Sequence, residues 1–156
     1  MIKVYFASDH AGFEMKNALV VYVRDELGHE IEDVGAREFD AGDDYPPIIA
    51  VAARSLAQDL KEGRDAKAII LGGSGQGEAI IANRFAGVRA VVYYGGQPEI
   101  IRLSREHNDA NVLSLGARFM GVDDAKKIVR EWLTTDFSKE ERHMRRVAEI
   151  ETIVQI

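Results

Sequence analysis

The stretch that decides the fold is Lys67-Ala68-Ile69-Ile70-Leu71-Gly72-Gly73-Ser74-Gly75-Gln76-Gly77-Glu78. Residues 67–71 are nearly all apolar, as expected for a strand buried on both faces of a sheet. The glycines that follow permit positive φ angles and close approach to a ligand, and the first amides of the next helix can face an anion. The stretch predicts a strand, a ligand-binding turn and a helix that starts near Gly77. A turn whose glycines serve packing alone is the alternative.

Apolar runs alternate with helical patterns on both sides of this stretch. Strands are expected at residues 2–7, 31–34, 67–71, 88–94 and 112–115, and helical patterns fill the segments between and after them. This alternation predicts a Rossmann-like three-layer α/β/α sandwich with a five-stranded parallel sheet. In such folds ligands bind beyond the carboxyl ends of the strands.

Polar residues suited to chemistry fall near the predicted strand ends. They are Asp9, His10, Ser74, Glu78 and His107. We expect them to converge on one active site. Three of them have a structural alternative here: Asp9 and His10 could cap a helix, and His107 could satisfy a carbonyl at a helix end.

An extra C-terminal helix is expected at residues 138–154, where Ser138 to Glu141 has the form of a capping box. Met144, Val147, Ile150 and Val154 give this helix an apolar stripe after the sheet is complete. We therefore expect it to pack on a partner subunit, within a chain that forms a single domain over residues 1–156.

The same helix carries a basic cluster. Arg142 and Arg146 are four residues apart and share a helix face, so together they could grip one phosphate. A solvated face paired with Glu140 and Glu141 is the alternative. His143 points to a different face, and we expect it, like His29, to be structural.

Composition limits the possible functions. The 156 residues are 46% apolar and 29% charged, as in ordinary globular proteins. The net charge of −6 argues against a nucleic-acid or anionic-membrane binder. No apolar run could span a bilayer and the N-terminus lacks a signal-peptide pattern, so a cytoplasmic location is expected. The absence of cysteine excludes disulfides, thiolate nucleophiles and Cys-ligated metals.

The glycine loop matches neither common nucleotide motif. Gly77 is followed by Glu78 instead of Lys-Ser/Thr, and the spacing of the glycines is not G-x-G-x-x-G. What remains is a set of amides with a carboxylate at its edge. Such a site can hold the negative oxygen that develops when a proton is removed beside a carbonyl.

Six blocks and the basic tail together resemble the ribose-5-phosphate isomerase B family, in the family's order and across the chain. The blocks are Ser8-Asp9-His10-Ala11-Gly12-Phe13, Asp44-Tyr45-Pro46, Gly73-Ser74-Gly75-Gln76-Gly77, Ala82-Asn83-Arg84, Ser104-Arg105-Glu106-His107-Asn108 and Gly116-Ala117-Arg118, and the tail is Arg142-His143-Met144-Arg145-Arg146.

The resemblance implies an aldose–ketose isomerase of the pentose phosphate pathway that interconverts ribose 5-phosphate and ribulose 5-phosphate through a cis-enediol, without metal or organic cofactor. By similarity, Glu78 would move the proton between C1 and C2, and His107 would open the furanose ring. The other implied contacts are Ser74 and the amides of Gly73, Gly75 and Gly77 to the enediolate oxygen, Asp9 and Asn108 to hydroxyls, Tyr45 to the sugar, and His10, Arg118, Arg142 and Arg146 to the phosphate. The family's site forms at a dimer interface, so a homodimer or homotetramer is expected.

One departure matters for the chemistry. Many family members carry a catalytic cysteine at the end of the third strand, where this chain has Gly72. Glu78 is similar to the base of the branch that uses glutamate instead. At a helix N-terminus the dipole favours an ionised carboxylate, and this favourable interaction alone is the structural alternative for Glu78. Because the dipole also lowers the basicity of the carboxylate, desolvation by bound sugar is expected to oppose its effect. Two other functions stay open: an isomerase of galactose 6-phosphate or allose 6-phosphate, and a non-catalytic sugar-phosphate-binding subunit.

Overall fold

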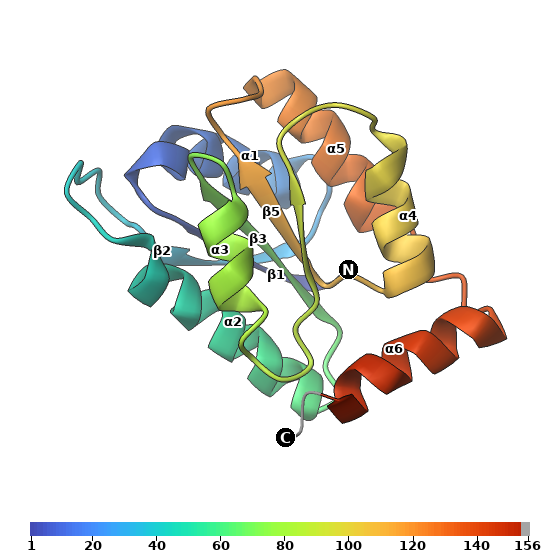
Figure 1. The fold of residues 1–156 in the computed structure, drawn as a ribbon. Helices are drawn as coiled ribbons and strands as arrows, with labels where there is room; N and C mark the ends of the chain where they lie inside the picture. The colour runs from blue at the N-terminus through green and yellow to red at the C-terminus, as the bar shows by residue number, and fades with distance from the viewer. Residues whose placement is uncertain (154–156) are drawn as a thin grey trace.

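A computed structural model describes residues 1–153 as an alternating series of strands and helices (Figure 1). The strands are β1 (Lys3–Ser8), β2 (Glu30–Gly35), β3 (Ala66–Gly72), β4 (Ala90–Tyr93) and β5 (Val112–Gly116). The helices are the short η1 (His10–Gly12), α1 (Phe13–Asp25), α2 (Tyr45–Lys61), α3 (Gln76–Ala82), α4 (Glu99–Asn108), α5 (Val122–Thr134) and α6 (Glu141–Ile153). The five expected strands are confirmed, the fourth being shorter than predicted.

All strand pairs are parallel, and their order in the sheet is β2-β1-β3-β5-β4. Strand β3 is central, between β1 and β5. In register, Ser8 pairs with Leu71, and Gly72 pairs with Gly116. The carboxyl ends of β1, β3 and β5 are therefore level, and the loops that follow these three strands meet at one edge of the sheet.

Two apolar cores lie on opposite faces of the sheet. Leu19, Ile101 and Trp132 bring α1, α4 and α5 onto one face, and Ile49 and Ala82 bring α2 and α3 onto the other. Strand β3 serves both faces by alternation, because Ile69 and Leu71 enter the first core while Ala68 and Ile70 enter the second. The predicted three-layer sandwich is confirmed.

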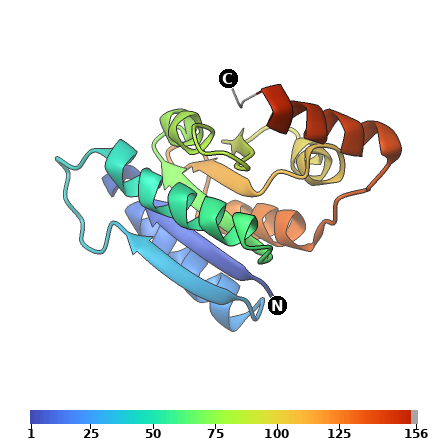
Figure 2. The same cartoon turned by 90° about the horizontal axis from the view of Figure 1, so that it is seen from below.

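Helix α6 lies outside both cores, next to α4 and at the margin of the molecule farthest from β2 (Figure 2). It begins at Glu141, so the capping box at Ser138 was wrong. Lys139 has a φ of 55°, outside the right-handed helical region, and the Ser138 hydroxyl accepts only from the amide of Glu140, at 3.4 Å. Met144 and Ile150 are exposed. Val154, the last member of the predicted stripe, lies outside the described residues.

Within residues 1–153, no helix is both long enough and apolar enough to cross a bilayer.

Candidate active site

The first part of the site follows β1. The Asp9 carboxylate accepts hydrogen bonds from the amides of Ala11 and Gly12, at 3.0 and 3.3 Å, and so caps η1. Asp9 is therefore a helix cap, as the structural alternative proposed. Its side chain is also close to Glu78, and its negative charge raises the pKa of Glu78. One residue can do both, because a carboxylate has two oxygens.

His10 is held by an acidic residue from the loop before α2. One carboxylate oxygen of Asp43 accepts from the His10 amide, at 3.1 Å, and lies 2.6 Å from its Nδ1. This hydrogen bond raises the pKa of His10, and the nearby charge of Arg118 opposes the rise. The structure therefore favours a cationic imidazolium at this end of the sheet.

The glycine loop brings Glu78 directly over the end of β3. Glu78 is the third residue of α3, and its side chain is buried. A Cβ atom added to Gly72 would lie 1.9 Å from Glu78 Oε1. The carboxylate thus occupies the space that any side chain at position 72 would need, so this position must be glycine while Glu78 points into the site.

Burial decides the ionisation of Glu78. Desolvation raises its pKa, the negative charge of Asp9 adds to the rise, and the hydrogen bond from its own amide opposes it. From the sequence, bound sugar was expected to provide this desolvation. The fold already provides it, because α3 packs the carboxylate against β3.

The rest of the loop is lined by aromatic, cationic and polar groups. The Tyr45 ring fills the space beside Gly77, where an added Cβ would lie 2.5 Å from its hydroxyl oxygen. The Arg118 guanidinium lies over Gly73, 3.2 Å from the position of a Cβ there. Ser114 donates to the carbonyl of Gly75 at 2.6 Å, and the Ser74 hydroxyl accepts from the amide of Gln76 at 3.3 Å. These contacts fix the loop against β5.

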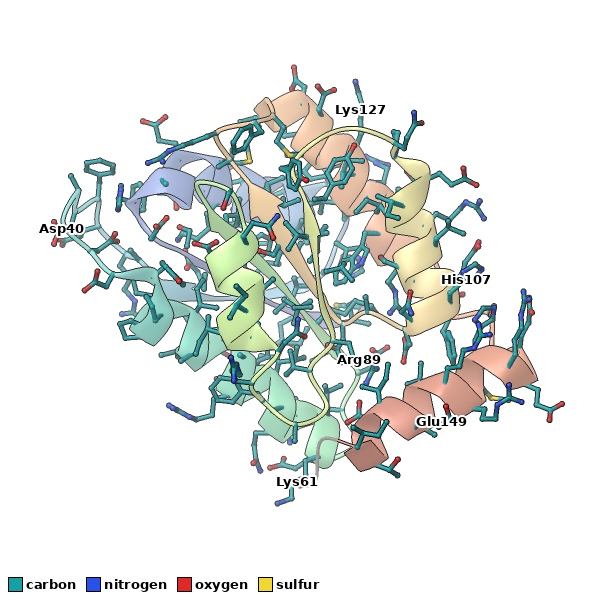
Figure 3. All side chains as sticks on the ribbon, viewed as in Figure 1. Asp40, Lys61, Arg89, His107, Lys127 and Glu149 are labelled. Carbon is teal, nitrogen blue, oxygen red and sulfur yellow. The ribbon has the colours of Figure 1, made fainter. Side chains whose placement is uncertain are left out.

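The other predicted site residues lie at the opposite end of the sheet. His107 and Asn108 end α4, and α4 runs back from the carboxyl end of β4 toward the amino end of β5. Figure 3 shows His107 at the end of α4 that faces α6. Strand β5 has five residues between that end and the glycine loop, roughly 13 Å at 3.3 Å per step. The prediction that His107 joins Glu78 at the strand ends is therefore wrong within one chain.

The physical reason is the direction of the helix. A helix that links two parallel strands must return the chain to their amino ends, so its last residues cannot reach the carboxyl edge. Arg142 and Arg146 share this distant location because α6 packs beside α4. The Arg142 guanidinium binds Glu140 at 3.0 Å, as the solvated-face alternative anticipated.

Two residues that contact predicted site residues were missed or misjudged from the sequence. Asp43 was not considered, since nothing in the sequence pairs it with His10 across 33 residues. His143 was expected to be merely structural, but its buried ring stacks on His107, with centroids 4.2 Å apart and planes 6° apart. By contrast, His29 does follow its structural alternative, accepting weakly from the amide of Ile2 at 3.4 Å.

One group of side chains has the spacing of a metal site. Ligand atoms of Asp9, His10 and Asp43 lie within 4.8 Å of one another. Their hydrogen bonds already explain this arrangement, because Asp9 caps η1 and Asp43 holds His10. The cluster therefore needs no metal to account for its geometry.

Comparisons with known proteins agree with this architecture. The profile of the Ribose/Galactose Isomerase family matches residues 4–150. The chain is 42% identical to ribose-5-phosphate isomerase B of Mycolicibacterium paratuberculosis over 147 residues, which cover 94% of this chain and 87% of the relative. It is 39% identical to the Escherichia coli ribose-5-phosphate isomerase B over 155 residues, covering 99% and 98%.

A solved structure has the same fold. The crystal structure of ribose-5-phosphate isomerase B from Mycoplasma genitalium with bound ribulose-5-phosphate superposes with a TM-score of 0.89 at 30% identity, covering 97% of this chain and 95% of that one. The profile match over nearly the whole chain, the two relatives and the shared fold place this chain in the Ribose/Galactose Isomerase family.

Proposed function

We propose that this chain is an aldose–ketose isomerase that interconverts ribose 5-phosphate and ribulose 5-phosphate. The observation that carries the proposal is the buried Glu78 carboxylate, seated against Gly72 with a raised pKa. A general base works best when its pKa is near the working pH, and burial moves Glu78 in that direction. The relatives from Mycolicibacterium paratuberculosis and Escherichia coli are named for this same reaction.

The proposed chemistry moves one proton between neighbouring carbons. Glu78 takes the proton from C2 of the open-chain aldose, and the C–H electron pair forms a C1=C2 double bond with negative charge on O1. The loop amides of Gly73, Gly75 and Gly77, with Ser74, stabilise this cis-enediolate. Protonated Glu78 then delivers the proton to C1, while O1 gains and O2 loses a proton, which leaves the ketone at C2. No metal or organic cofactor takes part.

The substrate-binding groups divide between two locations. His10 and Arg118 lie near Glu78 and are proposed to meet the phosphate, with Asp9 at a sugar hydroxyl and Tyr45 along the pocket wall. His107, Asn108, Arg142 and Arg146 are proposed to act on the sugar ring, a hydroxyl and the phosphate, but they lie at the far end of the sheet. One chain alone therefore holds an incomplete site.

We propose that a second copy completes the site. Edge strand β4 has one unpaired side, and it lies between α3, which carries Glu78, and α4, which carries His107. Ile80 on α3 and Ile100 on α4 are 61% and 56% exposed, and a second copy packed beside β4 would cover both. A two-fold axis beside β4 would bring α3 of one subunit to α4 and α6 of its partner. We therefore propose a homodimer, or a tetramer of such dimers. The cytoplasmic location stays a prediction.

The test measures isomerisation of five-carbon and six-carbon sugar phosphates by the wild type and by Glu78→Gln. We expect wild-type turnover of ribose 5-phosphate and a loss of about 10²–10⁴-fold in the variant, the usual contribution of a general base. Glu14→Gln, at an exposed glutamate in the first turn of α1, is the matched control and should be unaffected. A faster reaction with galactose 6-phosphate or allose 6-phosphate would reassign the substrate, and binding without turnover would leave only a binding subunit.

A further inference from the structure

His143 differs from its neighbours on α6. Most of this helix is exposed, but the His143 side chain is only 5% exposed. Its ring lies parallel to that of His107, at 4.2 Å between centroids. A buried imidazole in this arrangement fixes the plane of the ring it covers, because a rotation of His107 would break the stack.

His143 also forms a hydrogen bond with Arg142. The Nε–H of Arg142 donates to His143 Nε2 at 3.2 Å and also to Glu140 at 3.0 Å. A nitrogen that accepts a hydrogen bond carries no proton, so His143 is the neutral tautomer protonated at Nδ1. Burial lowers the pKa of His143, and His107, Arg142 and Arg146 lower it further against the opposing charge of Glu140.

We propose that His143 is a positioning residue that holds His107 and Arg142 at a fixed separation. This inference rests on the proposed function, in which His107 opens the sugar ring and Arg142 grips the phosphate. In a sugar 5-phosphate, the ring oxygen and the phosphate are joined by a short covalent chain, so the groups that bind them must keep a matching distance. A buried ring that contacts both side chains provides that constraint, and small misplacements in such sites are costly.

Two variants separate the two contacts of His143. His143→Gln keeps an oxygen that can accept from Arg142 but removes the stacked ring. His143→Phe keeps a stacked ring but removes the acceptor. His29→Gln, at a histidine in the turn before β2, is the matched control. For each variant, kcat and KM are measured separately with ribose 5-phosphate, whose ring must be opened.

We expect opposite patterns. In His143→Gln, kcat with ribose 5-phosphate falls about tenfold while KM changes less than about twofold, because ring opening needs an oriented His107. In His143→Phe, kcat stays within about twofold of the wild-type value, and KM rises about three- to tenfold because Arg142 is no longer held. The same losses of kcat and KM in both variants, in proportion to the loss in Tm, would show a merely structural role, and unchanged kinetics would also overturn the inference.

A readout besides activity separates this inference from the proposed function. Nitrogen-15 NMR of the wild type should show His143 protonated at Nδ1 and unprotonated at Nε2 near neutral pH, and the His107 ring signals should shift in His143→Gln but little in His143→Phe. If these signals behave as expected in a protein that isomerises no sugar phosphate, the proposed function fails while the arrangement stands. If His143 is doubly protonated, the inference fails whatever the activity.

Discussion

The two regions that carry the proposed site are built in different ways. The Glu78 region lies at the level ends of β1, β3 and β5, where short loops and buried backbone leave each group little freedom. The His107 region is built from the end of α4 and from α6, whose arginines are exposed and whose one deeply buried side chain among the described residues is His143. In the proposed site, proton transfer would therefore take place at the buried edge of the sheet, whereas ring opening and part of the phosphate binding would depend on a largely exposed helix and on a second copy.

Mixing two inactive variants gives the largest expected effect and tests whether the two regions combine across subunits. In a dimer with shared sites, Glu78→Gln and Arg142→Ala subunits together form one intact site and one doubly altered site. An equal mixture that exchanges subunits should therefore recover about a quarter of wild-type turnover, from preparations that are each nearly inactive. Turnover is measured before and after subunit exchange. No recovery in a mixture shown to contain mixed dimers would show that the two regions do not combine across the subunits.

The next effect tests how tightly the Glu78 region is built. Gly72→Ala places a methyl group where the Glu78 carboxylate lies, and the resulting displacement should lower kcat on the order of 10²-fold while KM changes less. Gly121→Ala is the control, since a Cβ there meets nothing within 4 Å. Wild-type kcat in Gly72→Ala would show that the carboxylate can act from another position.

A smaller effect concerns charge at the same end of the sheet. Asp43 raises the pKa of His10, so in Asp43→Asn this pKa falls back toward its ordinary value and His10 loses its proton at a lower pH. The KM for sugar phosphate should therefore begin to rise at a lower pH in the variant, with a gap of a few-fold near pH 7–8 and none near pH 5.5. Asp40→Asn, in the same exposed loop, is the control (Figure 3). Parallel KM profiles for Asp43→Asn and the wild type would remove Asp43 from phosphate binding.

The smallest effect is on stability. Because the folded-state pKa of Glu78 is raised, the fold holds its proton more tightly than the unfolded chain does, and stability is lost as pH rises through that pKa. Glu78→Gln removes this loss, so its Tm should exceed that of the wild type at pH 8. The difference should vanish below about pH 4, where the carboxyl is protonated in both states. A variant less stable at pH 8 would mean that the ionised carboxylate has a stabilising partner.

Some of the fold and site could be predicted because the signals are local. The buried run before Gly72 and the glycines after it specify a strand, a turn and a helix through short-range preferences for burial and backbone angle. The placement of His107 was predicted wrongly because it depends on the direction of α4 relative to the sheet. The pairing of His10 with Asp43 and of His107 with His143 joins residues 33 and 36 positions apart, and single-sequence patterns do not encode such contacts.

The alternation of strands and helices, the turn that presents Glu78 and the family to which the chain belongs can all be read from the order of residues along the chain. These follow from apolar periodicity and from residue types that neighbouring positions require. Only the tertiary structure decided that the Glu78 carboxylate fills the space over Gly72, that burial sets its pKa, and that His107 lies at the opposite end of the sheet. Those features depend on strand order and on which surfaces pack together, since both desolvation and distance arise from contacts between segments far apart in the chain.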